Sequence, residues 1–220
     1  MARYSTSSTV AAIFEVFLIG STVPAASAVL DPELRIVIRT YDASTVTGEL
    51  AAAGSVAAAI LEDGGVGVTW VSCEVAFVER NSNPCLSPLA ANELSIRFVR
   101  LPRPLAEREP MTLGESLIDT GLRSGSLATI YVNRVSHLAA LCRVDMATLL
   151  GRAVAHEIGH LLLGNAGHAA AGLMRASWSQ KTLRRAIAGD WTFTAADASE
   201  VREGVRIRNA RRIAAVSSGQ

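Results

Sequence analysis

The sequence feature that constrains this chain most is the pentapeptide HEIGH at positions 156–160, which lies in a segment with helical periodicity. Apolar side chains recur there on one stripe, at Leu150, Val154, Ile158, Leu161 and Leu162. Asp145 is a suitable N-cap before this segment, and Gly164 is a suitable C-cap glycine after it. The pattern predicts one helix from about residue 145 to residue 163, in which the two histidines of HEIGH share a face.

These histidines have the spacing of a metal site. Because residues four apart lie on the same face of a helix, His156 and His160 can bind one cation. Glu157 is rotated by about 100° from His156, so its carboxylate lies beside such a metal and can take a proton from water. A zinc ion needs a third protein ligand, and His168, beyond the helix stop at Gly164, is the candidate. The sequence therefore predicts Zn²⁺ held by three histidines, with Glu157 as the general base.

The stretch HEIGHLLLGNAGH at 156–168 resembles the zinc signature of the metzincin peptidases, HExxHxxGxxH, and is most similar to the matrixin type. The sequence GLMR at 172–175 resembles the Met-turn of that family, with Met174 beneath the zinc. Three residues, in place of two, stand on each side of Gly164, so the helix and the loop each gain one residue. The resemblance implies a zinc metalloendopeptidase that hydrolyses peptide bonds in protein or peptide substrates.

Segments rich in β-branched residues predict four strands, at 34–39, 66–71, 94–99 and 128–132. An Ala-rich segment at 47–61 predicts a helix, and a strand–helix–strand unit of this length favours parallel pairing. A last helix is expected at 195–208. The resemblance to metzincins implies an α+β fold with a mixed twisted sheet of about four to five strands, a packed helix, an active-site helix and a C-terminal helix. It also implies that the strand at 128–132 is the sheet edge on which an extended substrate lies.

The N-terminus predicts export. Residues 10–19 form a short apolar run, and the sequence Ala-Ser-Ala at 26–28 has the small residues that a signal peptidase accepts. We therefore expect a signal peptide at 1–28 and a single catalytic domain at 29–220. The expected protein is secreted or periplasmic, monomeric and without stable membrane insertion.

Three cysteines are present, and two of them are close in sequence. The residues NSNP at 81–84 form a turn signal between Cys73 and Cys85, and an exported chain can oxidise such a pair. We expect this disulfide, with Cys142 as a small buried apolar residue. Three reduced thiols are the alternative.

The charge balance argues against nucleic acid as a partner. The chain has 21 Lys and Arg against 20 Asp and Glu, and a net charge of +1 gives no general attraction to polyanions. The Arg-rich segment 202–212 is expected to be a solvated helix face, with a nucleic-acid patch as the alternative. Two other readings stay open. One is a metzincin-like protein that binds zinc without turnover and serves as a binding module. The other is an HExxH protein of a different class, in which Glu200 or Glu203 replaces His168.

Overall fold

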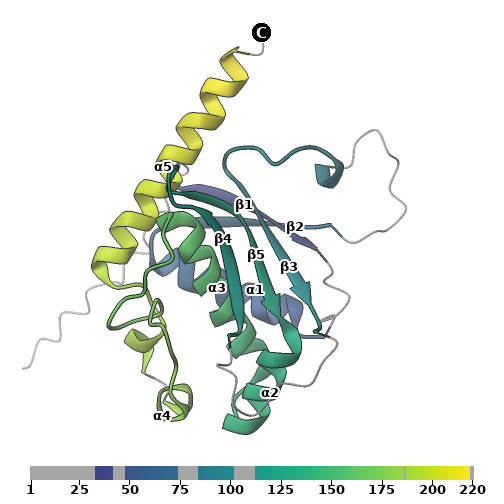
Figure 1. The fold of residues 1–220 in the computed structure, drawn as a ribbon, viewed down its shortest axis with the longest axis vertical. Coiled ribbons are helices and arrows are strands. Elements are labelled where there is room, and N and C mark those ends of the chain that lie inside the picture. The colour runs from purple at the N-terminus through teal and green to yellow at the C-terminus, as the bar shows by residue number, and fades with distance from the viewer. Residues whose placement is uncertain (1–32, 42–47, 74–83, 102–111, 186, 219–220) are drawn as a thin grey trace, which may run out of the picture.

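The computed structural model describes residues 33–41, 48–73, 84–101, 112–185 and 187–218. Its centre is a five-stranded sheet in the order β2-β1-β3-β5-β4 (Figure 1). Neighbouring strands are parallel except that β4 runs antiparallel to β5. The strands are β1 (Arg35–Tyr41), β2 (Gly67–Ser72), β3 (Glu93–Val99), β4 (Gly114–Asp119) and β5 (Ser124–Tyr131). The predicted α+β fold with a mixed sheet is confirmed, as is the parallel pairing of the strands on either side of α1 (Leu50–Asp63).

Helix α3 (Met146–Leu163) is the central helix that packs on the sheet. It contacts β4 and β5 of the sheet, and also α1 and α5 (Ala195–Ser218). A Cβ on Gly151 would lie 2.5 Å from the carbonyl oxygen of Ala53, so a glycine at this position allows α1 and α3 to touch. Fifteen of the eighteen residues of α3 are buried. The apolar stripe seen in the sequence is thus only one side of a helix that is covered on most sides, and the polar side chains of His156, Glu157 and His160 are buried too.

The structure corrects one prediction about the sheet edge. The strand predicted at 128–132 belongs to β5, which lies between β3 and β4, so it is an interior strand and β4 is the edge. The sequence of β4, GESLID, has a single β-branched residue, and its pattern does not predict a strand. Two short elements are also additional to those expected, α2 (Val132–Cys142) directly after β5 and α4 (Gln180–Arg184). Single 3-10 turns are formed at η2 (Pro84–Leu86) and η3 (Ala188–Asp190).

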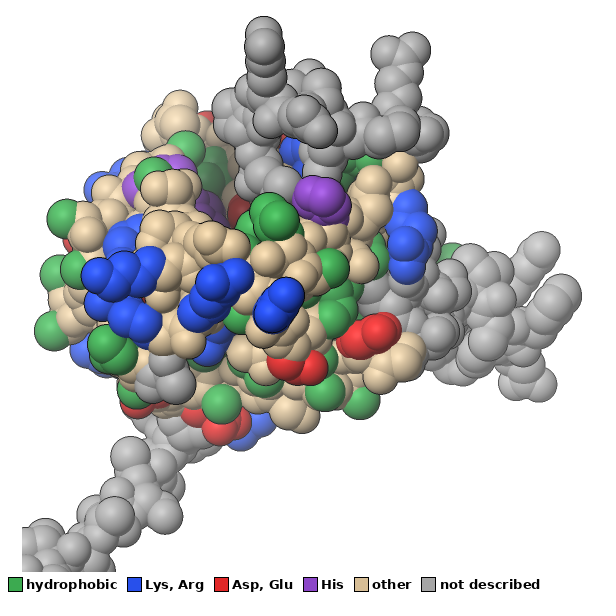
Figure 2. All heavy atoms as spheres, turned by 90° about the horizontal axis from the view of Figure 1, so that it is seen from below, with side chains coloured by type: hydrophobic (Ala, Val, Ile, Leu, Met, Phe, Trp, Pro, Cys, Tyr) green, Lys and Arg blue, Asp and Glu red, His purple; other side chains and the backbone are tan. Residues whose placement is uncertain are grey.

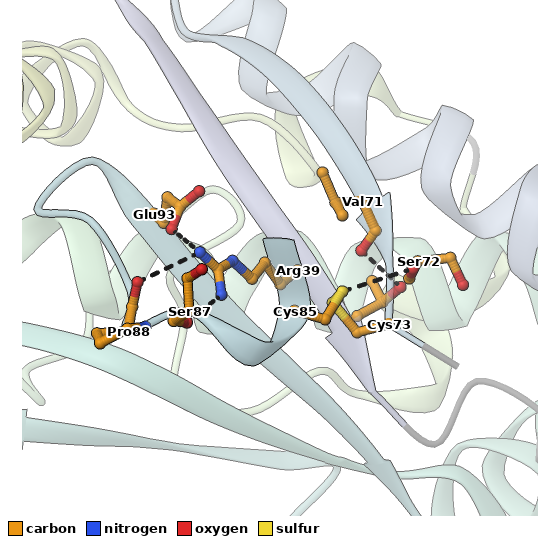
Figure 3. The surroundings of a disulfide bond; sticks show 9 residues. Arg39, Val71, Ser72, Cys73, Cys85, Ser87, Pro88 and Glu93 are labelled. Carbon is orange, nitrogen blue, oxygen red and sulfur yellow. Dashed lines mark hydrogen bonds and ion pairs between the residues drawn. A yellow bond between two sulfur atoms is a disulfide. The ribbon is translucent and has the colours of Figure 1, made fainter. Parts of the chain in front are cut away.

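At the opposite end of the sheet, the connection from β2 to β3 is held in two ways (Figure 3). Cys73 and Cys85 form the predicted disulfide, with their Cα atoms 5.5 Å apart. The guanidinium of Arg39, on β1, is buried and forms an ion pair with the carboxylate of Glu93. It also donates a hydrogen bond of 2.7 Å to the carbonyl oxygen of Ser87. These bonds fix residues 84–93 against the sheet face that α3 does not cover.

The C-terminal helix α5 is longer than predicted and projects past the sheet (Figure 1). Within its Arg-rich segment, Arg208 is buried and donates hydrogen bonds to three backbone carbonyls, including that of Leu161 at 3.1 Å. The prediction of a solvated face is therefore wrong at Arg208, because a long guanidinium side chain can satisfy carbonyls that the fold leaves without donors. Arg206, Arg211 and Arg212 are exposed, as expected.

Two further expectations concern the ends and the third cysteine. Cys142 is buried on α2, as predicted. The predicted signal peptide at 1–28 lies outside the described residues. Among the residues that are described, no helix has both the length and the apolar character to cross a bilayer.

Candidate metal centre

Helix α3 begins and ends where the sequence predicts. The carboxylate of Asp145 accepts a hydrogen bond of 2.7 Å from the N–H of Thr148, and Gly164 ends the helix with a φ of +62°. A Cβ at position 164 would lie 2.0 Å from the carbonyl oxygen of Arg123, so no other residue fits there. Glycine therefore lets the chain turn back at this point, and residues 165–178 return along the part of α3 that carries the histidines.

This return brings three imidazoles together. The Nε2 atoms of His156 and His160 are 3.1 Å apart. His168 joins them from the returning segment, and one ring nitrogen of each histidine lies within 4.8 Å of the others. His156 and His160 are buried, whereas His168 is exposed. The three residues could hold a metal ion, and the longer spacing around Gly164 does not prevent His168 from reaching the other two.

Backbone carbonyls set the tautomers of the two buried rings. The Nδ1 of His156 lies 2.9 Å from the carbonyl oxygen of Leu173, and the Nδ1 of His160 lies 3.1 Å from that of Asn165. Because a carbonyl only accepts, each Nδ1 carries the proton and each Nε2 presents a lone pair. Metal-bound histidines usually donate such a hydrogen bond from the ring nitrogen that does not bind the metal. Two lone pairs that face each other at 3.1 Å repel, and a cation between them removes the repulsion.

Burial also keeps these rings neutral. It lowers the pKa of His156 to about 4, and the neighbouring His160 and His168 add to this effect against the carbonyl of Leu173. Burial is likewise the main cause of the lowered pKa of His160. A neutral imidazole is the form that binds a metal ion. Three nitrogen ligands with room for a further ligand are the donor set of catalytic zinc sites, so the residues present fit zinc.

Glu157 lies beside the imidazoles and is held by the edge strand β4. The hydroxyl of Ser116 is 2.7 Å from Oε2 of Glu157 and 2.9 Å from its backbone carbonyl oxygen. Gly114 makes room for the carboxylate, since a Cβ there would lie 2.9 Å from Oε1 of Glu157. Burial raises the pKa of Glu157 to about 7, although the Ser116 hydrogen bond opposes this shift. A carboxyl group with a pKa near neutrality is suited to take up and release protons.

The imidazoles and Glu157 line one cleft of about 580 Å³ between β4 and the returning segment. Figure 2 shows histidine side chains at the wall of a hollow in the face seen from below. Trp178 lies edge-on to His156, with the ring centres 5.5 Å apart, and donates its indole N–H to the carbonyl of Leu173. Arg175 also lines the cleft, and Asp190 holds its guanidinium in an ion pair of 3.3 Å. The cleft is thus lined by the imidazoles and Glu157, by the aromatic ring of Trp178 and by the ion-paired guanidinium of Arg175.

Met174 is buried behind the helix. Its sulfur lies close to α3 at Gly159, where a Cβ would be 2.6 Å from it. A side chain at position 159 would therefore push Met174 and its loop away from the helix. The position of Met174 beneath a metal stays a prediction.

The alternative with a glutamate as third ligand does not agree with the fold. Glu200 and Glu203 are exposed on α5 and line a separate cleft of about 390 Å³ beside Leu161 and Arg211. In the described part of the chain, the group that could hold a metal ion consists of His156, His160 and His168. His168, and not Glu200 or Glu203, therefore lies close enough to His156 and His160 to act as a third ligand.

Sequence reasoning missed the residues of β4 that contact Glu157. Gly114 and Ser116 lie in a stretch without a predicted element, and Ser116 is 41 positions before Glu157. Neither residue type points to chemistry on its own, and only the pairing of β4 with β5 brings them to α3. No signal in the sequence could have singled them out.

Comparisons with known proteins give likeness in structure but none in sequence. No protein family model matches the sequence, and no curated protein sequence matches it. The structure is similar to that of a zinc-dependent peptidase from Methanocorpusculum labreanum (strain Z), with 16% sequence identity and a TM-score of 0.48. The matched region covers 75% of this chain and 99% of that one. The motif-specific resemblance to metzincins stays confined to residues 156–174.

Proposed function

We propose that this chain is a zinc-dependent endopeptidase, with His156, His160 and His168 as the metal ligands. The observation that carries the proposal is the pair of Nε2 atoms 3.1 Å apart, both with lone pairs facing inward because both Nδ1 atoms donate to carbonyls. Two lone pairs that face each other inside a protein are unfavourable unless a cation lies between them. Beside this pair of nitrogens is a buried carboxylate in an accessible cleft, which a purely structural metal site does not need.

The reaction assigned to the site is hydrolysis of a peptide bond. Bound zinc would supply a Lewis acid for the scissile carbonyl and for the attacking water. Glu157 accepts a proton from that water as the water oxygen bonds to the carbonyl carbon. The C–N bond then breaks, and Glu157 gives the proton to the leaving amine. One water is consumed, and the products are a carboxylic acid and an amine, which ionise to a carboxylate and an ammonium group near neutral pH. In the metal-free protein burial raises the pKa of Glu157 to about 7, and a carboxyl group that titrates near neutral pH is suited to both proton transfers.

The edge strand β4 is the proposed site for the substrate backbone. Among the described strands, β4 pairs only with β5, and its residues 114–116 line the cleft that holds the histidines. An extended peptide that adds to this edge through main-chain hydrogen bonds would run past His156 and Glu157. This places the substrate on β4 in place of the strand at 128–132.

The decisive experiment compares the wild type with Glu157→Gln. Both proteins are loaded with one equivalent of zinc, and hydrolysis of a labelled denatured protein is followed with and without a chelator. We expect the variant to keep its zinc and to lose about 10²- to 10⁴-fold in kcat, since it cannot accept a proton. Glu203→Gln, on the exposed face of α5, is the matched control and should behave as the wild type.

A zinc-loaded wild type that is no more active than Glu157→Gln would refute the peptidase proposal. The zinc-binding module without turnover would then be the better description, because zinc content would be unchanged.

We also infer that the protein is exported as a single catalytic domain. The disulfide between Cys73 and Cys85 supports this, since such bonds persist in oxidising compartments. Mass analysis of the mature protein from its host tests the proposed cleavage after residue 28, and size-exclusion chromatography of the same sample tests the predicted monomer.

A further inference from the structure

The edge strand β4 meets the proposed catalytic base through two side-chain positions. Alternate residues of a strand point to the same face, so Gly114 and Ser116 both face α3. Gly114 supplies the space that the Glu157 carboxylate occupies, and Ser116 supplies a hydroxyl that reaches it. The strand proposed to receive substrate is thus in direct contact with the base.

The hydroxyl of Ser116 has two oxygen neighbours on the same residue. It is 2.7 Å from Oε2 of Glu157 and 2.9 Å from the backbone carbonyl oxygen of Glu157. A hydroxyl has one proton to donate and two lone pairs to accept with. It can therefore donate to one of these two oxygens at a time, and the shorter distance is the one to the carboxylate.

We propose that Ser116 is a positioning residue for Glu157, whose hydroxyl holds the carboxylate in one orientation against β4. The inference rests on the proposed function, because it assigns Ser116 a part in orienting the base of that reaction. A buried carboxylate in a low-dielectric cleft needs such a partner, since loss of the hydrogen bond would cost free energy and let the side chain rotate.

A simpler role for Ser116 would be to pin β4 to α3, and the two roles differ in what they change. If Ser116 only holds β4 against α3, its removal loosens the edge strand, weakens substrate binding and raises KM. A positioning residue that is lost misplaces the base and lowers kcat while KM stays the same.

The experiment uses zinc-loaded wild type, Ser116→Ala, Ser116→Thr and the control Ser126→Ala, which removes an exposed hydroxyl on neighbouring β5. For Ser116→Ala we expect kcat to fall about 10- to 100-fold with KM unchanged within about 2-fold, as is typical when a residue behind a catalytic group is removed. Ser116→Thr keeps the hydroxyl in a residue that suits a strand, so it should recover most of kcat. Ser126→Ala should match the wild type.

Two further measurements are independent of these rates. In the double variant Ser116→Ala with Glu157→Gln, we expect no additional loss beyond that of Glu157→Gln alone, because both changes act on the same group. Crystal structures of the zinc-loaded variants should show the Glu157 carboxylate rotated in Ser116→Ala and in place in Ser116→Thr.

Several outcomes would overturn the inference while leaving the peptidase proposal intact. These are a kcat of Ser116→Ala within about 2-fold of the wild type, a loss confined to KM, additive losses in the double variant, or an unmoved carboxylate in the Ser116→Ala structure. A wild type without zinc-dependent hydrolysis would overturn both.

Discussion

Two regions of this molecule bury titratable side chains, and they satisfy them differently. At the β2 end of the sheet, the guanidinium of Arg39 is 4% exposed and is paired with the carboxylate of Glu93 and with backbone carbonyls. At the β4 end, His156, His160 and Glu157 are also buried. Among the described residues no lysine or arginine forms an ion pair with Glu157. In the first region the charge is paired within the fold, and only Nε of Arg39 has no hydrogen-bond partner among the described residues, whereas the second region presents lone pairs and a carboxylate to a cleft.

The difference separates a structural use of buried charge from a reactive one. A buried charge that finds its counter-charge inside the fold holds elements together and has nothing left to offer a ligand. Buried groups without such a partner have shifted pKa values and can bind a cation or exchange protons with a substrate.

Arg39→Ala should destabilise the protein strongly. It leaves the carboxylate of Glu93 partly buried without its partner and removes bonds to residues 84–93, so we expect a loss of about 3–5 kcal/mol in unfolding free energy. Urea denaturation measures this loss. Arg206→Ala, which breaks the exposed pair with Glu203, is the control and should cost no more than about 0.5 kcal/mol. Equal losses in both variants would remove the contrast, and zinc content should be unaffected in either.

In metal-free protein, pH should act on the two kinds of buried group in opposite directions. The pKa of Glu157 is raised from 4.5 to about 7, so the folded state binds more protons than the unfolded state and stability falls as pH rises through that window. The pKa of His156 is lowered from 6.5 to about 4, so stability rises with pH between those values, and His160 adds in the same sense.

Glu157→Gln should uncover the histidine contribution. Wild-type stability should change little between pH 4.5 and 6.5, whereas the unfolding free energy of the variant should rise by up to about 3 kcal/mol over this range. Urea titrations at several pH values with a chelator present provide the measurement. A variant whose pH profile runs parallel to that of the wild type would contradict the assignment of the Glu157 pKa.

Zinc should stabilise the wild type and not the variant that lacks its third ligand. At a free zinc concentration 100 times the dissociation constant, we expect a gain of about 2.7 kcal/mol, and His168→Ala should lose most of it at the same concentration. Glu200→Ala and Glu203→Ala should gain as much as the wild type. Thermal unfolding with and without zinc measures the gains. An undiminished gain in His168→Ala would show that the ligand set assigned here is wrong.

Elements whose signals are local could be predicted from the amino-acid sequence. The cap at Asp145, the stop at Gly164 and the spacing of His156 and His160 follow from helix geometry within about twenty residues, and the structure has each where it was expected. The disulfide between Cys73 and Cys85 could also be predicted, because a short loop with turn residues brings these two cysteines close together.

The tertiary structure alone decided what depends on contacts between distant segments. The edge position of β4 is set by pairing across the sheet, and the contact of Ser116 with Glu157 joins residues 41 positions apart. The carbonyls that orient the histidine rings, and the burial of Arg208 beneath three backbone oxygens, have the same origin. Hydrophobic periodicity states which residues lie inside but not which neighbours they find there, because burial is non-directional whereas hydrogen bonds require defined partners.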